Sequence, residues 1–181
     1  MKATDLIGKP LSVEGHMITH TGILFNLLEP RMEDIDPLDI AVHLSRTDRW
    51  NGGTRHFYSV AEHCCRCHDK APQHLKPLAL LHDAEEAYWG DVIKTVKMLL
   101  KREGSEIPDK MSELRKLIFR RFGISEEGYE EIVKIDMEEL QWDFDNQIVA
   151  FKHFPWDEMI ATTEWLRRFN ELVDAGQIKY P

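Results

Sequence analysis

The chain of 181 residues has only three cysteines, and they lie close together at Cys64, Cys65 and Cys67. Cysteines placed in this way cannot form an ordinary disulfide framework, and their odd number favours a reducing compartment. Long apolar stretches are also missing, since runs such as Leu78–Leu81 are far too short to span a bilayer. No apolar run follows Lys2, so no signal peptide is expected. These absences predict a cytoplasmic protein with no membrane partner.

Basic residues are scarce relative to acidic ones. With 23 lysines and arginines against 32 aspartates and glutamates, the formal net charge is −9 at neutral pH. A broad nucleic-acid-binding face needs an excess of positive charge, so a nucleic-acid polymer is not expected as a partner. A small anionic substrate stays compatible, because a few cations in one cleft can hold a phosphate. The composition, 43% hydrophobic and 30% charged, is typical of a folded globular protein.

Helix start and stop signals follow one another along most of the chain. Ser59 with Glu62 matches a capping box, in which the serine is expected to cap the helix and the glutamate to reach back to it. Glycines such as Gly123 stand in C-cap positions. The predicted helices begin at Pro37 after the N-cap Asp36, then cover residues 60–70, 75–87, 92–101, 110–122 and 125–150, and end with a helix from Asp157 to Gly176.

These signals predict an all-α bundle of about six to eight helices. β-branched and aromatic residues between positions 12 and 28 surround His20-Thr21-Gly22, which predicts a short N-terminal β-hairpin. Since no repeat, low-complexity tract or linker interrupts the chain, we expect one domain over residues 1–181 with a motif-bearing core at about 36–150.

An adjacent His82-Asp83 pair directly follows the apolar run Leu78–Leu81. Burying an imidazole and a carboxylate without partners is costly, and a divalent cation that took one ligand from each would relieve the cost. Glu86 lies four residues after His82, close enough to border the same cavity. The pair therefore predicts a metal site on this helix.

Two other residues complete a ligand set. His63 lies one turn into the preceding helix, and Asp136 lies among apolar residues of the long helix at 125–150. Together with His82 and Asp83 they offer two nitrogens and two carboxylates, which suits Co²⁺, Mn²⁺, Fe²⁺ or Zn²⁺ better than Ca²⁺. Such an ion makes water a usable nucleophile near neutral pH and polarises a phosphoryl group.

This order of ligands, H…HD…D, resembles that of the HD-domain phosphohydrolase superfamily. The likeness extends to further motifs: Arg49-Trp50, Ser59-Val60-Ala61-Glu62-His63, His82-Asp83-Ala84-Glu85-Glu86, Gly90-Asp91 and Lys97. Over roughly residues 36–140 the chain resembles the YfbR-like 5′-deoxynucleotidases and the prophage-type, YfdR-like HD hydrolases. The resemblance implies one divalent transition metal and a small-molecule nucleotide substrate. Related enzymes often form homo-oligomers.

The resemblance also implies roles for individual residues. In the YfbR-like group a metal-bound water attacks the phosphorus, and acids in the positions of Glu86 and Asp91 assist proton transfer. Arg49 matches the arginine that holds phosphate, and Trp50 matches a tryptophan that favours 2′-deoxyribose. Other substrate contacts carried over are Arg55 and Lys97. The expected reaction releases phosphate from (deoxy)nucleoside 5′-monophosphates.

Two other functions use the same motifs. The first is hydrolysis of (deoxy)nucleoside triphosphates, which additional cations near the cleft would favour, such as Arg55, Lys94 or Lys97. The second belongs to another class, a non-catalytic HD module that senses a nucleotide. Glu86 and Asp91 disfavour it, because a degenerate binding module would be expected to lose ligand or acid positions.

Other interpretations of the motif residues are structural. A zinc knuckle at the cysteines is disfavoured because Cys64 and Cys65 diverge by about 100° on a helix, and no second cysteine pair exists to close a tetrahedral site. The second His-Asp pair, His68-Asp69, is interpreted as solvated surface. Glu85 is interpreted as the solvated neighbour of Glu86.

Overall fold

The computed structural model describes residues 2–6 and 14–180, and the helices and hairpin below are those of these residues. Strand β1 (His16–Ile18) pairs antiparallel with β2 (Leu24–Asn26), with Met17 opposite Phe25. The Thr21 backbone and hydroxyl both donate to the Asp39 carboxylate, at 2.7 and 2.8 Å, and so tie the turn of the hairpin to the first long helix. The predicted N-terminal hairpin is confirmed. Residues 12 and 13 of the predicted segment lie outside the described residues.

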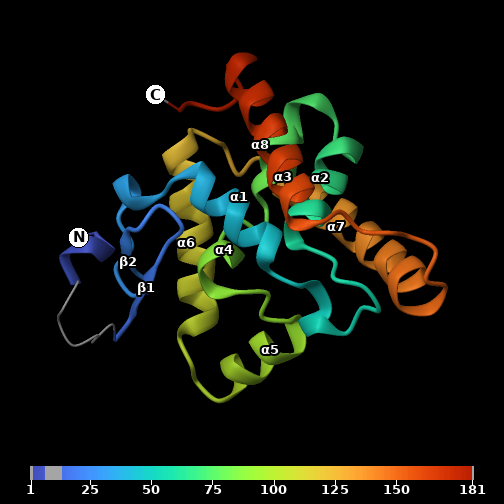
Figure 1. The fold of residues 1–181 in the computed structure, drawn as a ribbon, viewed down its shortest axis with the longest axis horizontal. Helices are drawn as coiled ribbons and strands as arrows, with labels where there is room; N and C mark the ends of the chain where they lie inside the picture. Colours follow the sequence, from blue (N-terminus) through green and yellow to red (C-terminus); the bar gives the residue numbers. More distant parts are fainter. Residues whose placement is uncertain (1, 7–13, 181) are drawn as a thin grey trace.

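Helices make up the rest of the architecture (Figure 1). The α-helices are α1 (Pro37–Arg46), α2 (Val60–Lys70), α3 (Lys76–Leu81), α4 (Glu86–Trp89), α5 (Lys94–Arg102), α6 (Ile107–Phe122), α7 (Tyr129–Asp143) and α8 (Glu158–Asp174). Short 3-10 segments are η1 (Ala3–Leu6), η2 (Met32–Asp34), η3 (Arg49–Gly52) and η4 (Gln73–Leu75), and the π-helical segment η5 (Phe144–Val149) continues α7. The predicted all-α bundle with a short hairpin is confirmed.

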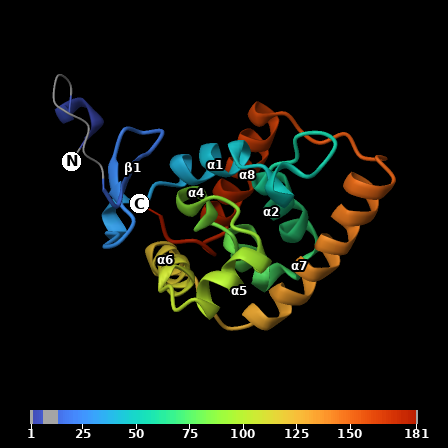
Figure 2. The same ribbon diagram turned by 90° about the horizontal axis from the view of Figure 1, so that it is seen from below.

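Helix α2 lies in the middle of the bundle, where it packs against α1, α3, α7 and α8. The hairpin and the segment α7–η5 lie at opposite ends of the molecule in both views (Figures 1 and 2). Fully buried side chains of the core include Leu80, Leu81, Trp165 and Phe169. Burying a side chain of this size stabilises the fold by roughly 1.5–3 kcal/mol. No helix of the described residues is long and apolar enough to cross a membrane.

The capping signals place most helix ends correctly. Asp36 accepts a hydrogen bond from Leu38 N at the start of α1, and Asp157 accepts one from Ile160 N at the start of α8. Ser59 Oγ accepts from Glu62 N at 3.2 Å. The other half of the predicted capping box is wrong. The Glu62 carboxylate instead accepts hydrogen bonds from His153 and from the backbone of Trp156, and thereby anchors the connection between η5 and α8.

The continuous helix predicted over 75–87 is also wrong, because it breaks at the His-Asp pair. Helix α3 ends at Leu81, residues 82–85 form turns, and α4 begins at Glu86. In the turns the backbone bonds tighten to three-residue spacing, as in Ala84 N to Leu81 O at 3.1 Å and Glu86 N to Asp83 O at 3.0 Å. The periodicity of apolar residues could not reveal this break, since these residues keep the same spacing before and after it.

Helix α7 begins at Tyr129 rather than at the predicted Ser125. Gly128 precedes it with φ of +86°, a conformation that favours glycine, and a Cβ there would lie 2.6 Å from Leu75 Cδ2. The Ser125 side chain caps a local turn instead, because its Oγ accepts a hydrogen bond from Glu127 N. The far end agrees better with the sequence, since η5 carries the helix on to Val149.

Candidate metal centre

The four predicted metal ligands come together at the middle of the bundle. His63 comes from α2, His82 and Asp83 from the turn after α3, and Asp136 from α7. Asp136 Oδ1 lies 3.1 Å from His63 Nε2 and 3.8 Å from His82 Nε2. Asp83 Oδ2 lies 3.2 Å from His82 Nε2 and 3.8 Å from His63 Nε2. These short distances join three segments that are remote in sequence.

The orientation of the His82 ring suits a metal ligand. Its Nδ1 is 2.8 Å from Ala79 O, and because a carbonyl oxygen only accepts, Nδ1 carries a hydrogen. The opposite nitrogen, Nε2, is buried and has no hydrogen-bond partner among the described residues. A backbone carbonyl that fixes the ring in this way is the usual support of a histidine that binds metal through its other nitrogen. The residues therefore fit a cation.

The charges around the two imidazoles also favour a cation. Burial lowers the pKa of His82, but the Asp83 charge and the neighbouring groups outweigh it, so the pKa lies well above its usual value. In the same way burial raises the pKa of Asp136, but the close approach of the His63 and His82 imidazoles brings the pKa far below its usual value. An environment that stabilises positive charge at the nitrogens also attracts a metal ion.

Asp143 completes the surroundings of His63 and was missed in the sequence. Its fully buried carboxylate Oδ2 lies 3.6 Å from His63 Nδ1, on the other side of the ring from Asp136. A carboxylate behind a histidine orients the ring and raises its basicity toward a metal. The available signal was spacing, because Asp143 follows Asp136 by seven residues and so lies on the same face of α7 two turns later.

The predicted phosphate-binding Arg49 lies beside the cluster. Its side chain is only 8% exposed, and Nε donates to Asp143 Oδ2 at 3.1 Å. One terminal nitrogen is 3.8 Å from Asp83 Oδ2. The guanidinium is therefore held between two carboxylates at the edge of the metal cluster, with its position fixed before any ligand binds.

Trp50 and Asp91 are joined by a hydrogen bond. The Trp50 backbone N donates to Asp91 Oδ2 at 3.2 Å, and this bond helps hold Trp50 and Asn51 in the left-handed conformation, with φ of 58° and 52°. Non-glycine residues in this region cost roughly 1–3 kcal/mol each and are common at ligand sites. The Trp50 ring lines an open pocket of about 290 Å³ on α7 and η5, together with Met137, Leu140, Gln141 and Phe144.

Glu86 and Lys97 form a half-buried pair, with Lys97 Nζ 3.4 Å from Glu86 Oε1. Burial raises the pKa of Glu86 well above its usual range, and the charges of Asp83 and Asp91 add to the shift. Glu85 is not solvated as predicted. It is 2% exposed and pairs with Arg115 at 3.2 Å.

Two other residues depart from the sequence-based interpretation. Arg55 is exposed, and its guanidinium lies 4.4 Å from the centre of the Phe151 ring, so no described contact brings it to the metal cluster. His68 of the second His-Asp pair is 5% exposed rather than solvated, and only its neighbour Asp69 is exposed, in a bidentate pair with Arg168. Neither residue shares a described contact with the four ligands.

Cys67 is a member of the cluster that the sequence did not predict. It follows His63 by one helical turn on α2, and its Sγ lies 3.6 Å from His63 Nε2. One ligand atom from each of His63, Cys67, His82 and Asp136 lies within 4.8 Å of all the others. The structure therefore contains a group of histidine, cysteine and aspartate side chains that can hold a metal ion.

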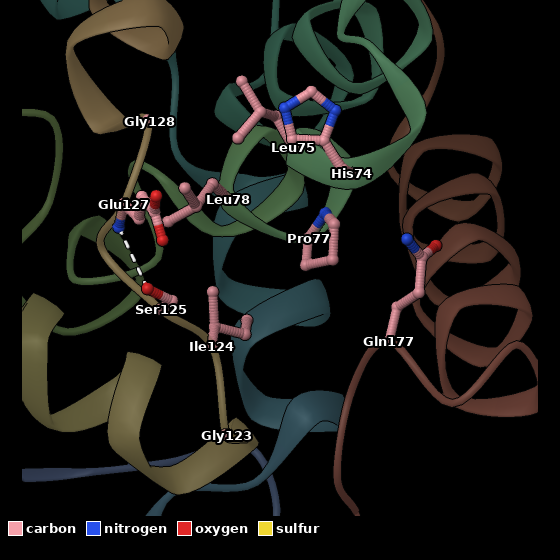
Figure 3. Close-up of a pocket in the computed structure, with 10 residues that line it drawn as sticks. All are labelled: His74, Leu75, Pro77, Leu78, Gly123, Ile124, Ser125, Glu127, Gly128 and Gln177. Carbon is pink, nitrogen blue, oxygen red and sulfur yellow. Dashed lines mark hydrogen bonds between the residues drawn. The ribbon is translucent and has the colours of Figure 1, made fainter.

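A separate pocket of about 470 Å³ lies between the start of α3, the loop at residues 123–128 and Gln177 (Figure 3). Pro77, Leu78 and Ile124 give it an apolar centre. None of the predicted site residues lines it. The chemistry-bearing side chains are thus gathered at the metal cluster and not in this pocket.

Comparison with known proteins supports one of the resemblances. No family model matches the chain. The uncharacterised protein YfdR of Escherichia coli is 43% identical over 82 residues, or 45% of this chain and 46% of that protein. An uncharacterised protein of Rhodobacter capsulatus is 35% identical over 113 residues, or 58% of this chain and 56% of its own length. The chain thus spans about half the length of the curated relatives it matches. The likeness to YfdR is confirmed to that extent, and membership of the wider HD superfamily stays a prediction.

Proposed function

We propose that the protein is a metal-dependent phosphohydrolase of the HD type that releases phosphate from nucleoside 5′-monophosphates. The observation that carries the proposal is the convergence of His63, His82, Asp83 and Asp136, with the unpartnered His82 Nε2 facing the other three. A divalent transition metal held there would activate water and polarise a phosphoryl group.

The residues around the cluster have separate roles in the proposed reaction. Arg49, fixed by Asp143, binds a phosphate oxygen at the metal, since a guanidinium offers paired donors to such an anion. Glu86, buried and with a raised pKa, supplies a proton to the leaving oxygen. Trp50 and Phe144 line the pocket on α7 and η5, whose aromatic wall suits a nucleoside, and the resemblance to the YfbR-like group implies that Trp50 favours a 2′-deoxyribose.

The positions of the nearby cations favour a monophosphate over a triphosphate. A longer phosphate chain needs positive charge beyond Arg49, and the sequence offered Arg55, Lys94 and Lys97 for it. Lys94 is exposed at the first residue of α5. Arg55 instead lies on the Phe151 ring, and Lys97 is paired with Glu86. Triphosphate hydrolysis is therefore the second candidate.

The test is phosphate release from a panel of deoxy- and ribonucleoside monophosphates, with Mn²⁺, Co²⁺ or Zn²⁺ added to the metal-free protein. A parallel triphosphate series is analysed by ion chromatography, so that tripolyphosphate is detected as well as phosphate. We expect phosphate from the monophosphates, no product without metal, and a loss of at least roughly 10³-fold in Asp83→Ala. Tripolyphosphate or phosphate from triphosphates alone would favour the second candidate.

A non-catalytic, nucleotide-sensing module would give a different result in the same experiment. If the protein binds metal and nucleotide tightly but releases no product with any ion, the catalytic proposal is wrong and a nucleotide-sensing module becomes the better account. Glu86→Gln is the matched variant for this question, because it leaves the four predicted ligands in place and removes only the proton donor. It should retain metal binding and lose turnover.

A further inference from the structure

We propose that Cys67 is a ligand of the same metal ion and that its sulfur makes the centre selective for Zn²⁺, Co²⁺ or Fe²⁺ over Mn²⁺ and Mg²⁺. The inference rests on the proposed function only in requiring that the cluster binds a metal. It adds a thiolate to the nitrogen and oxygen ligands expected from the sequence. Soft thiolate ligands favour zinc-like ions, whereas carboxylate and water ligands suit Mn²⁺ and Mg²⁺.

The position of Cys67 supports this role. It is fully buried on the same face of α2 as His63, four residues later, and its sulfur is 3.6 Å from His63 Nε2. Its ligand atom is within 4.8 Å of those of His82 and Asp136. Nitrogen, sulfur and oxygen atoms at such spacing are ligands that zinc accepts, and Asp83 Oδ2 lies beside them, 3.2 Å from His82 Nε2.

A second observation comes from the other side of the cluster. His82 Nε2 is buried, has no hydrogen-bond partner in the described chain, and belongs to the same group of ligand atoms. This nitrogen therefore points to an ion within the group of ligand atoms that includes Cys67 Sγ. An ion shared by the sulfur and the nitrogen satisfies both.

Cys64 and Cys65 differ from Cys67 in where they lie. Cys64 groups with His82 and Asp83 but not with His63 and Asp136, and Cys65 belongs to neither group of candidate ligands found in the described residues. All three are fully buried on one helix. Cys65 therefore serves as a matched control with the same residue type, burial and helix as Cys67.

Binding through sulfur requires that the Cys67 thiol loses its proton. The S–H bond breaks, the sulfur lone pair forms the bond to the ion, and the proton leaves to the buffer. Zn²⁺ binding should consequently release one more proton in the wild type than in Cys67→Ala. Calorimetric titration in buffers of different ionisation enthalpy measures this difference.

The direct experiment is X-ray absorption at the zinc edge of the zinc-loaded full chain. We expect one sulfur at about 2.3 Å beside nitrogen or oxygen ligands at about 2.0–2.1 Å. The cobalt-loaded chain should show a thiolate-to-cobalt charge-transfer band in the near ultraviolet. Both signals should disappear in Cys67→Ser and Cys67→Ala and persist in Cys65→Ser.

Affinity provides the measure of selectivity. Competition with a chelator measures the affinity for Zn²⁺. Loss of a residue that only supports a metal ligand typically weakens metal binding by roughly 10- to 100-fold, and Cys67→Ser should weaken Zn²⁺ binding by at least that factor. Mn²⁺ binding should change little, so the ratio of the two affinities falls. Circular dichroism establishes that each variant is folded. If neither Cys67 variant folds, a sulfur signal that persists in Cys64→Ser still assigns the ligand to Cys67, because Cys64 is the other cysteine grouped with candidate ligands.

The outcomes separate this inference from the proposed function. A zinc shell of nitrogen and oxygen alone, or a charge-transfer band that survives in Cys67→Ser, would overturn the role of Cys67 and leave the phosphohydrolase proposal intact. A protein that binds none of these ions would overturn both. Sulfur ligation without any hydrolysis would support Cys67 as a ligand and refute the enzyme.

Discussion

The guanidinium of Arg49 and the carboxylate of Asp143 form a buried ion pair between segments separated by 94 positions in the sequence, with Nε 3.1 Å from Oδ2. Asp143 is fully buried, and the Arg49 side chain is only 8% exposed. The same carboxylate oxygen lies 3.6 Å from His63 Nδ1. One aspartate thus holds the predicted phosphate-binding arginine and lies close to a predicted metal ligand.

Removal of Arg49 should destabilise the protein strongly. Arg49→Met leaves the Asp143 carboxylate buried without its cation, which typically costs about 3–5 kcal/mol. Urea unfolding followed by circular dichroism measures the loss. The double variant Arg49→Met/Asp143→Leu removes both charges and should recover part of the stability. A single variant within about 0.5 kcal/mol of the wild type would show that the pair is not important for folding.

Substitution of Trp50 should reduce discrimination between deoxy and ribo substrates. Trp50→Asn is the suitable variant, because asparagine tolerates the left-handed backbone at φ of 58° while it removes the ring. We expect the ratio of kcat/KM for a deoxynucleotide over its ribonucleotide to fall by roughly 10-fold. Trp50→Phe, which keeps an aromatic wall, should preserve most of the ratio. An unchanged ratio in Trp50→Asn would remove Trp50 from the sugar site.

Proton donation by Glu86 predicts a specific pH dependence. A general acid must be protonated, so the rate should fall as the pH rises through the pKa of Glu86, which burial has raised well above its usual range. Lys97 lowers that pKa. In Lys97→Met the falling limb of the pH–rate profile should therefore move to higher pH, whereas Lys94→Met, at an exposed position, should leave it in place.

Loss of the acid itself should have a larger effect. Glu86→Gln should lower kcat by roughly 10²- to 10⁴-fold and remove the falling limb. Metal content should stay at the wild-type level. A limb that shifts to lower pH in Lys97→Met would contradict the assignment of Glu86 as the acid.

Local signals in the sequence predicted much of the fold. Asp36, Ser59 and Asp157 cap the helices that they were expected to begin, because a side-chain cap depends on only a few neighbouring residues. The break after Leu81 and the late start of α7 at Tyr129 were not predicted. The late start of α7 depends on packing between distant segments, since a Cβ at Gly128 would lie against Leu75.

The candidate site was also predicted only in part. His63, His82, Asp83 and Asp136 were chosen from charged residues in apolar surroundings, and the fold brings all four together. Asp143 and Cys67 were missed, because the contacts that suggest a role for them are formed only in the folded protein. Asp143 pairs with Arg49, and Cys67 lies in the metal cluster. Glu85 was misjudged because its partner Arg115 lies 30 positions later.

The two His-Asp pairs of this chain allow the most direct test of the metal-dependent phosphohydrolase account. Asp83 of the first pair lies in the metal cluster, and Asp69 of the second binds Arg168 at the end of α2. We would measure kcat/KM for phosphate release from a deoxynucleoside monophosphate, together with bound metal, in Asp83→Asn and Asp69→Asn. The account predicts that Asp83→Asn loses activity by at least roughly 10³-fold and that Asp69→Asn keeps it. Equal activity in the wild type and Asp83→Asn would contradict the account.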